Sequence, residues 1–395
     1  MCHPIPVVVS QPEVLIPNVP DLTKWAVIAC DQFTGEPEYW ENLTEFVGDA
    51  PSSLRFVLPE AWLEQRLASA PPQIAAEMER AQSEGWFETH QGYVLVERML
   101  PSGVRRLGLM ADIDLDAYDY TDSGTAAIRA TEKTVAERLP ARVAVRQAGT
   151  LDVPHVLVLL DDPKSRVIES LYEKRESFDQ LYDFDLNQNG GHLRGWLLPD
   201  DDGAITRQLE SLTKDGLFAV VGDGNHSLAA AKLSGDSQAL VELTNIHDEA
   251  NYFEPIHRIV FDGGPELADE LIAFLRGRVG RDGSQTDLYH DGETTAVPIP
   301  ANPADAIADI QQFLDEYLVS RPDTEIDYIH GDDNLRNIAD RARATGRDAL
   351  GIFLPRIDKS GLFDYVVRRG VLPRKAFSIG HAEDKRYYLE LAHRK

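Results

Sequence analysis

One segment of this chain, residues 217–232, constrains the fold and the chemistry more than any other. The apolar run 217–221 predicts a buried strand, the following Gly-Asp-Gly predicts a tight turn, and residues 227–232 predict a helix. Glycine permits left-handed backbone angles and a close approach of a ligand to the backbone. The first N–H groups of a helix lack intrahelical acceptors, and together with the helix dipole they attract anions.

Several polar side chains follow this turn and surround the predicted anion site. Asp223 can coordinate a metal ion, accept a proton from a hydroxyl group, or only stabilise the turn. The alternative is an ordinary strand-to-helix turn in which Asp or Ser caps the helix. The residues of the candidate site are Gly222, Asp223, Gly224, Asn225, His226 and Ser227.

The rest of the sequence predicts a mixture of strands and helices without the regular alternation of a doubly wound sheet. Strands are predicted at 25–30, 92–97, 105–115, 154–160, 240–245, 256–261, 349–354 and 364–368. Helices are predicted at 37–47, 61–84, 125–139, 205–213, 266–278, 305–319 and 334–346. We therefore expect an α+β fold with a mixed sheet core in residues 1–262. The linker signal Gly263-Gly264-Pro265 separates it from a C-terminal α+β region, 263–395.

The composition excludes several classes of protein. With 39 Lys+Arg against 66 Asp+Glu, the formal net charge of −27 repels phosphate backbones and argues against nucleic-acid partners. No apolar stretch approaches the roughly 20 residues of a membrane span, and the first residues lack the basic region of a signal peptide. We expect a cytoplasmic protein with a small-molecule substrate and no membrane partner. Cys2 and Cys30 are too few for a disulfide scaffold, and Cys30 is expected to be a buried structural residue.

Two further residues are candidates for a phosphate site. Glu132 lies on the helix predicted at 125–139, and it is either a solvated helical residue or a carboxylate that activates a substrate hydroxyl. His257 and Arg258 lie on a predicted strand, so their side chains point to opposite faces. Arg258 is either a phosphate clamp or one partner of a salt bridge.

A third candidate is a row of carboxylates, and some familiar motifs are missing. Asp112, Asp114 and Asp116 share one face of a predicted strand, which suits either Mg²⁺ binding or an exposed strand edge. The sequence contains no P-loop, no dinucleotide fingerprint and no H-E-x-x-H motif. It also lacks the nucleophile elbow of α/β-hydrolases and the protein-kinase signature set.

Five ordered motifs of the chain resemble those of the bacterial domain-of-unknown-function family 1015. They are residues 29–33, 108–114 leading into 128–134, 221–227, 255–258, and 372–377. The family's "I…HEKT" run has Thr131 in place of the usual His here. In the family's A-D-G-H-H-R turn, Asn225 replaces the first His and Ser227 replaces the Arg. The loss of that Arg removes a bidentate phosphate donor.

The same turn more distantly resembles the phosphate-binding turn of the ParB/sulfiredoxin superfamily, which includes free serine kinases and CTP-binding partition proteins. This resemblance implies a ParB/sulfiredoxin-like core with N-terminal and C-terminal elaborations. It also implies that residues 223–227 hold nucleotide phosphates and that Glu132 is the base.

The function predicted from these residues is a nucleotide-dependent phosphotransferase that acts on a small hydroxyl compound, such as a serine-like amino acid. ATP or ADP would bind at the turn, and His226 would help to hold the phosphates. Arg258 and Lys375 would neutralise charge, and Asp31 or Asp223 would hold Mg²⁺. Two alternatives stay open. One is a non-catalytic nucleotide or metabolite sensor, and the other is a cofactor-free hydrolase or isomerase with His226 and Asp223 as its acid/base pair.

Overall fold

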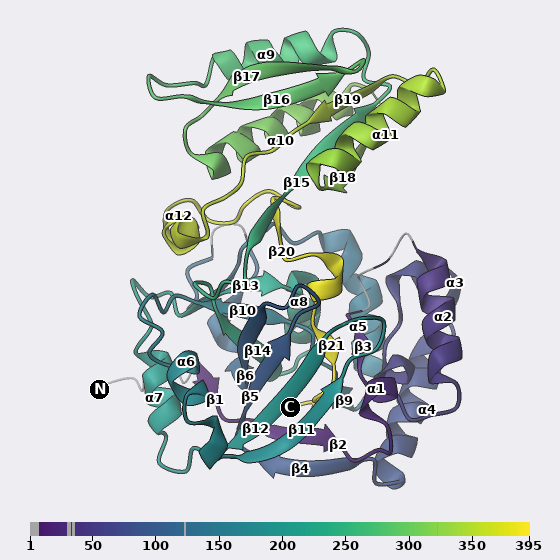
Figure 1. Ribbon diagram of the computed structural model, residues 1–395, viewed down its shortest axis with the longest axis vertical. Coiled ribbons are helices and arrows are strands. Elements are labelled where there is room, and N and C mark those ends of the chain that lie inside the picture. Colours follow the sequence, from purple (N-terminus) through teal and green to yellow (C-terminus); the bar gives the residue numbers. More distant parts are fainter. Residues whose placement is uncertain (1–7, 30–32, 34–35, 122–123, 322) are drawn as a thin grey trace. The chain divides into compact units, whose positions relative to one another are not determined.

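The computed structural model describes residues 8–29, 33, 36–121, 124–321 and 323–395 (Figure 1). It divides into two compact units. Unit 1 comprises Met1–Tyr252, Phe363–Gly370 and Gly380–Lys395, and unit 2 comprises Phe253–Leu362 and Val371–Ile379. Residues 253–262 therefore belong to unit 2, and two C-terminal segments belong to unit 1. The division into a core at 1–262 and a C-terminal region at 263–395 stays a prediction.

A large mixed sheet forms the centre of unit 1. Within the described residues its order is β11–β12–β5–β6–β14–β10–β13–β8–β7, with β1 paired to β6. The pairs β14–β10, β13–β8 and β8–β7 are parallel, and the other pairs are antiparallel. The strands are β1 (Val9–Ser10), β5 (Tyr93–Met99), β6 (Arg105–Asp114), β7 (Tyr118–Asp119), β8 (Ile128–Ala130), β10 (Leu157–Leu160), β11 (Asp179–Asp185), β12 (His192–Leu198), β13 (Ala219–Asp223) and β14 (Gln238–Asn245). This confirms the α+β class and the mixed sheet.

Helices and short strands surround this sheet in unit 1. The α-helices are α1 (Leu22–Trp25), α2 (Pro37–Val47), α3 (Leu63–Arg66), α4 (Ala70–Ser83), α5 (Leu139–Ala148), α6 (Ile168–Tyr172), α7 (Ala204–Glu210), α8 (Asn225–Leu233) and α12 (Leu362–Arg369). The two-stranded pairs are β2 (Glu13–Pro17) with β4 (Phe87–Gln91), β21 (Tyr387–Tyr388) with β3 (Val27–Ile28), and β22 (Ala392–His393) with β9 (Leu151–Asp152). The 3₁₀ turns of this unit are η1 (Ser53–Phe56), η2 (Glu60–Trp62), η3 (Leu115–Ala117), η4 (Ala136–Arg138), η5 (Arg175–Ser177) and η7 (Ala382–Asp384). Among the described residues, no helix combines the length and the apolar character needed to cross a membrane.

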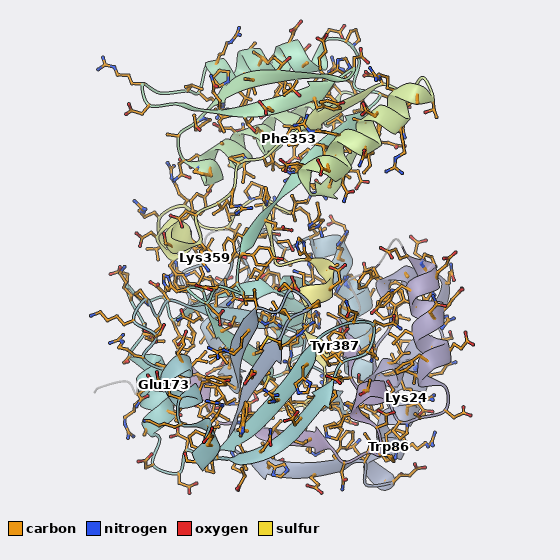
Figure 2. All side chains as sticks on the ribbon, viewed as in Figure 1. Lys24, Trp86, Glu173, Phe353, Lys359 and Tyr387 are labelled. Carbon is orange, nitrogen blue, oxygen red and sulfur yellow. The ribbon has the colours of Figure 1, made fainter. Side chains whose placement is uncertain are left out.

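The C-terminal segment is built into the core of unit 1. Leu391 exchanges backbone hydrogen bonds of 2.7 and 3.0 Å with Leu15 in β2. Trp86 and Tyr387, both labelled in Figure 2, are buried in the same apolar cluster. Residues far apart in the sequence therefore share one core, and the C-terminal segment is part of it.

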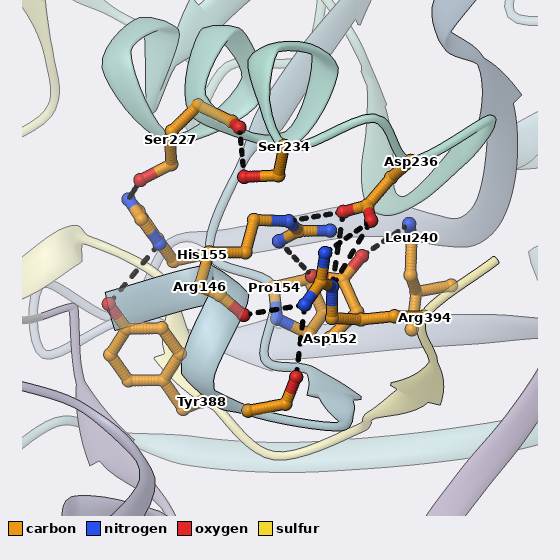
Figure 3. Close-up of polar contacts among 12 residues, drawn as sticks. Arg146, Asp152, Pro154, His155, Ser227, Ser234, Asp236, Leu240, Tyr388 and Arg394 are labelled. Carbon is orange, nitrogen blue, oxygen red and sulfur yellow. Dashed lines mark hydrogen bonds and ion pairs between the residues drawn. The ribbon is translucent and has the colours of Figure 1, made fainter. Parts of the chain in front are cut away.

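Four charged side chains hold the end of this segment (Figure 3). Arg146 lies 2.7 Å from the carboxylate of Asp152 and 2.6 Å from that of Asp236. Arg394 lies 2.6 Å from the other oxygen of Asp236. Because Asp236 precedes β14 and Arg394 follows β22, this network ties the chain's end to the central sheet.

Unit 2 contains an antiparallel sheet with three α-helices in the part that the structure describes. Its strand order is β17–β16–β19–β15–β18, with β20 paired to β15. The strands are β15 (Phe253–Phe261), β16 (Ser284–His290), β17 (Glu293–Ile299), β18 (Glu325–His330), β19 (Ala349–Ile352) and β20 (Phe377–Ile379). The helices are α9 (Leu267–Arg276), α10 (Pro303–Val319) and α11 (Asp332–Ala344), with the 3₁₀ turn η6 (Lys359–Gly361). The helices predicted at 266–278, 305–319 and 334–346 are confirmed.

The helix predicted at 125–139 is wrong. Residues 128–130 form β8, which pairs in parallel with β13 and β7. This pairing buries Ile128 and Ala130 completely, a gain that exceeds the weak local helix preference of a segment rich in β-branched residues. The helix begins only at Leu139, with Pro140 in its first turn, where the missing N–H of proline costs nothing.

The strand predicted at 364–368 is also wrong, and the strand predicted at 25–30 is shorter than predicted. Residues 362–369 form α12, whose apolar residues Leu362, Phe363 and Val366 have helical spacing and are buried. Trp25 ends α1, which Asp21 caps by accepting the N–H of Lys24, so the strand is limited to Val27–Ile28. The structural role expected of Cys30 lies outside the described residues.

His257 in β15 makes the stability of unit 2 depend on pH. Its Nδ1 accepts the N–H of Leu354 at 3.0 Å, and its Nε2 lies 2.9 Å from Asp332, to which the neutral ring donates. Burial lowers the pKa of His257, although Asp332 opposes this shift. Between the two pKa values the unfolded chain binds more protons than the folded chain, so the free energy of unfolding rises with pH there. We expect the stabilising contribution of the neutral His257 to be fully present above pH 6.5, the ordinary pKa of histidine. The free energy of unfolding should then fall as the pH is lowered below 6.5.

Hydrogen exchange of peptides from residues 253–261, measured by mass spectrometry between pH 5 and 8 and corrected for intrinsic exchange, tests this expectation. His257→Gln removes the titrating group and should flatten the profile. His290→Gln, which removes a half-exposed His paired with Asp348, is the control and should keep the wild-type profile. Identical profiles for wild type and His257→Gln would contradict the assignment.

Candidate functional site

The strand, turn and helix predicted at 217–232 are present. β13 leads into α8 through Gly224, whose φ of +83° lies in the left-handed region. In the pairing of β10 with β13, Leu157 lies opposite Asp223 and Val158 lies opposite Val221, so Gly222 is the extra residue of a β-bulge. Bulges re-aim the neighbouring side chains, here that of Asp223. A Cβ on Gly224 would lie 3.0 Å from the side chain of Val156, so glycine is required there by both space and backbone angle.

The N-terminus of α8 presents its amides without a side-chain cap. The first helical hydrogen bond runs from the N–H of Leu228 to the carbonyl of Gly224, at 3.0 Å. The N–H groups of Asn225, His226 and Ser227 precede that bond, and no side chain caps the helix. The alternative of a turn capped by Asp or Ser is therefore not observed. All six residues of the turn, 222–227, are partly exposed, so the site is open to solvent.

A buried lysine lies beside this turn, and sequence reasoning did not identify it. The ammonium of Lys385 lies 3.3 Å from Asp223, with 7% of the Lys385 side chain and 18% of the Asp223 side chain exposed. The second Asp223 oxygen accepts the N–H of Gly224 at 3.0 Å. The sequence did contain a signal for this lysine, because Lys385 and Arg386 directly precede the apolar run 387–389. Charged side chains next to a buried apolar run are seldom buried without a partner of opposite charge.

The backbone that carries Lys385 is held by buried arginines. Arg98 donates to the carbonyls of Glu383 at 2.7 Å and Asp384 at 3.0 Å, and also to that of Lys385. Arg106 donates to the carbonyl of Asp384 at 2.7 Å. Burial, together with the neighbouring Arg106, lowers the pKa of Arg98 to about 9, which still leaves it charged at neutral pH. The ammonium of Lys385 is thus presented from a rigid support.

Glu132 lies at the same edge of the sheet as the turn. Because β8 and β13 are parallel neighbours, the segments that follow them leave the sheet at one edge. The hydroxyl of Thr131 donates to the carbonyl of Val221 at 2.7 Å, and the N–H of Val135 donates to Nε2 of His226 at 3.0 Å. The loop 131–135 is therefore fastened to the turn on both sides of Glu132, although Glu132 is on a loop and not on the predicted helix.

Two buried polar atoms of this region have no hydrogen-bond partner among the described residues. They are Oδ1 of Asn225, in the first turn of α8, and Oγ1 of Thr134, in the loop after β8. Buried polar atoms in native proteins are normally paired, so each such atom requires an explanation. Both atoms are shielded from solvent, so a ligand bound at the surface of the turn does not account for them.

The two cations predicted for the phosphates belong to unit 2. Arg258 is fully buried, and its guanidinium donates to the carbonyls of Ile256, Arg374 and Lys375 at 2.6 to 3.1 Å. It also donates to the side chain of Gln311 at 2.9 Å. Arg258 thus fixes the backbone around residues 374–375, where Lys375 is exposed and has a φ of +56°. Phosphate binding by Arg258 and Lys375 stays a prediction.

The row of aspartates predicted at 112–116 is neither a metal site nor an exposed edge. Asp112 is buried and pairs with Lys395, and burial raises the pKa of Asp112 against the opposing effect of Lys395. Asp114 accepts the N–H of Asp116 and caps the short turn η3. The described part of the chain holds no group of three or more His, Cys, Asp or Glu placed to bind a metal ion. Asp31 lies outside the described residues.

A Mg²⁺ ion fits the turn in one way only. Mg²⁺ is usually held by one or two carboxylates together with water and substrate phosphates. Asp223 offers one such carboxylate, which already faces the ammonium of Lys385. An ion that arrives on the nucleotide phosphates would be compatible with this donor set, whereas a metal held by the protein alone would not.

These features define an α+β protein with a strand–turn–helix at one edge of a mixed sheet, which is the candidate anion site. The chain belongs to the DUF1015 family, described as a protein of unknown function, whose model matches residues 16–317. No curated protein matches the chain.

Three solved structures are similar to the chain at low scores. A conserved hypothetical protein from Pyrococcus furiosus is 13% identical, with 71% of this chain and 90% of that chain covered and a TM-score of 0.37. A free serine kinase in complex with AMP is 14% identical, with 72% and 91% covered and a TM-score of 0.40. SbnI with a C-terminal truncation, from Staphylococcus aureus, is 11% identical, with 69% and 82% covered and a TM-score of 0.39.

Proposed function

We propose that this chain is a nucleotide-dependent phosphotransferase with a ParB/sulfiredoxin-like core that transfers a phosphoryl group from ATP or ADP to a small hydroxyl compound, such as a serine-like amino acid. The observation that carries the proposal is the uncapped N-terminus of α8 beside the buried ammonium of Lys385. Helix amides and a fixed cation together form a binding site for phosphate groups. With a net charge of −27, the chain needs such local donors to hold a polyanion at all.

Each residue of the site has a role in this proposal. Gly222 and Gly224 let phosphate oxygens approach the backbone, and the N–H groups at 225–227 donate to them. His226 holds the loop 131–135 against the helix.

The remaining roles concern charge and proton transfer. Lys385 neutralises phosphate charge, and Asp223 keeps its ammonium in place and is available to a Mg²⁺ ion carried by the nucleotide. Glu132 accepts the proton of the substrate hydroxyl. Phosphoryl transfer requires mainly positioning and charge neutralisation, which these groups are suited to provide.

Nucleotide binding tests the turn directly. We expect Lys385→Gln to weaken ATP or ADP binding by about 10- to 100-fold, because a charge-assisted hydrogen bond contributes about 1.5–3 kcal/mol. His226→Ala should weaken binding as well, because it removes the acceptor of the Val135 N–H that holds the loop 131–135 against the turn. Isothermal titration calorimetry measures the affinities, and circular dichroism checks that the variants are folded. Lys214→Gln removes a lysine that is about two-thirds exposed in the same unit and serves as the matched control. Unchanged affinity in both site variants would show that the turn does not bind the nucleotide.

A single-turnover product analysis separates the proposal from its alternatives. A phosphotransferase converts bound nucleotide and produces a phosphorylated hydroxyl compound in equal amounts. A sensor would leave the terminal phosphate in place apart from slow hydrolysis. A hydrolase or isomerase that uses His226 and Asp223 would act with no nucleotide present.

A further inference from the structure

A second reactive arrangement lies at the same turn, and no part of the proposed transfer uses it. Oγ of Ser227 lies 3.2 Å from Nε2 of His155, and Nδ1 of His155 lies 3.2 Å from the hydroxyl of Tyr388 (Figure 3). His155 and Tyr388 are buried, and their rings meet edge to face at 5.3 Å. Ser227 is partly exposed. A hydroxyl within hydrogen-bond reach of a buried base that a third group orients is the arrangement of an activated nucleophile.

Three separate parts of the chain supply these residues. Ser227 is the third residue of α8, His155 precedes β10, and Tyr388 is in β21. A Cβ on Gly224 would lie 3.4 Å from Nε2 of His155, an ordinary van der Waals distance, so the imidazole lies directly beside the turn. When Nδ1 carries the ring proton and donates to Tyr388, Nε2 is free to accept the proton of Ser227.

We propose that Ser227 is a phosphoryl acceptor, with His155 as its general base and Tyr388 as the positioning residue, so that the chain phosphorylates its own anion site. This inference rests on the proposed function, because the phosphoryl donor is the nucleoside triphosphate bound at the turn. Nε2 of His155 takes the proton of Ser227, and the serine oxygen forms a bond to the terminal phosphorus. The bond from that phosphorus to the bridging oxygen breaks, and the nucleoside diphosphate leaves with the electron pair. The imidazolium then releases its proton to water.

The neighbouring groups suit this step. The ammonium of Lys385 and the amides of the first turn of α8 face the same turn and stabilise the charge that develops on the phosphoryl oxygens. Once phosphorylated, Ser227 would place a dianion where the nucleotide phosphates bind, so the modified chain should bind nucleotide more weakly.

The experiment uses the full chain, ATP and MgCl₂. Tandem mass spectrometry locates the phosphate, and its time course gives the rate for wild type, Ser227→Ala, His155→Gln and Tyr388→Phe. Ser234→Ala is the matched control, because Ser234 ends the same helix and donates to the carbonyl of Ala230 without a His partner. Calorimetry of each variant with ADP separates nucleotide binding from transfer.

We expect one phosphate on Ser227 in the wild type and in Ser234→Ala, and none at this position in Ser227→Ala. His155→Gln should slow the reaction by about 100-fold or more, the contribution of a general base. Tyr388→Phe should slow it by about 10-fold with unchanged ADP affinity, which a merely structural role would not produce. If His155→Gln does not fold, Tyr388→Phe and Ser227→Ala carry the test.

Two results overturn this inference and leave the proposed function intact. They are ADP binding without any phosphate on Ser227, and an undiminished rate in folded His155→Gln or Tyr388→Phe. The absence of ATP and ADP binding in the wild type would instead overturn the proposed function, and the inference with it.

Discussion

Replacing Glu132 by Gln is expected to leave nucleotide affinity within about twofold of wild type and to reduce phosphoryl transfer to the hydroxyl substrate by about 10²–10⁴-fold. The amide cannot accept the substrate proton, whereas the phosphate site formed by Lys385 and the first turn of α8 is unchanged. The measurement is nucleotide turnover in the presence of L-serine as the probe, with calorimetry for the affinity. Turnover should fall while the affinity does not.

Glu137→Gln is the matched control for this prediction. Glu137 follows in the same loop, in η4, and its side chain is exposed. The control should keep wild-type turnover. Glu132→Gln should also retain phosphorylation of Ser227, since His155 is the base for that step. Normal turnover of L-serine by Glu132→Gln would remove Glu132 from the mechanism.

Arg386→Met is expected to destabilise unit 1 by about 3–5 kcal/mol, the cost of breaking a buried ion pair from one side. Arg386 forms ion pairs with Glu242 and with Glu390, and the exposed fractions of these three side chains are 3%, 3% and 0%. The hydroxyl of Tyr182 also donates to Glu390. Without Arg386, two carboxylates would stay buried with no cation between them.

Urea unfolding followed by tryptophan fluorescence measures this effect, because Trp25 and Trp86 are buried in the core of unit 1. The matched control is the triple variant Arg386→Met, Glu242→Gln, Glu390→Gln. It removes the uncompensated charge, and most of the lost stability should return. A loss below about 1 kcal/mol in Arg386→Met would show that the network contributes little.

The same network explains a glycine that has no role in a turn. A Cβ on Gly108, in β6, would lie 2.2 Å from the carboxylate of Glu242. Glycine at this position leaves the space that the buried carboxylate occupies. Without knowledge of where Glu242 lies, the sequence offers no reason for a glycine in the middle of this strand.

Local sequence patterns predicted an element correctly where its buried side chains recur at the regular spacing of a helix or a strand. The helix at 37–47 and the strand–turn–helix at 217–232 are both present, because apolar spacing, proline and glycine act over a few residues. The pattern failed at 125–139, where burial of Ile128 and Ala130 between two other strands decides the conformation. It also failed at α12, a short apolar segment for which helix and strand spacings are hard to distinguish.

The sequence by itself determined the α+β class, the acidic charge and the position of the glycine turn, because these depend on composition and on residues close together in the chain. Only the tertiary structure decided which distant groups meet that turn. These groups come from three other segments: the loop that carries Glu132, the segment of His155, and the C-terminal segment of Lys385 and Tyr388. Sheet pairing and burial bring the three segments to one edge. No local pattern contains this information, since it arises from contacts between residues far apart in the sequence.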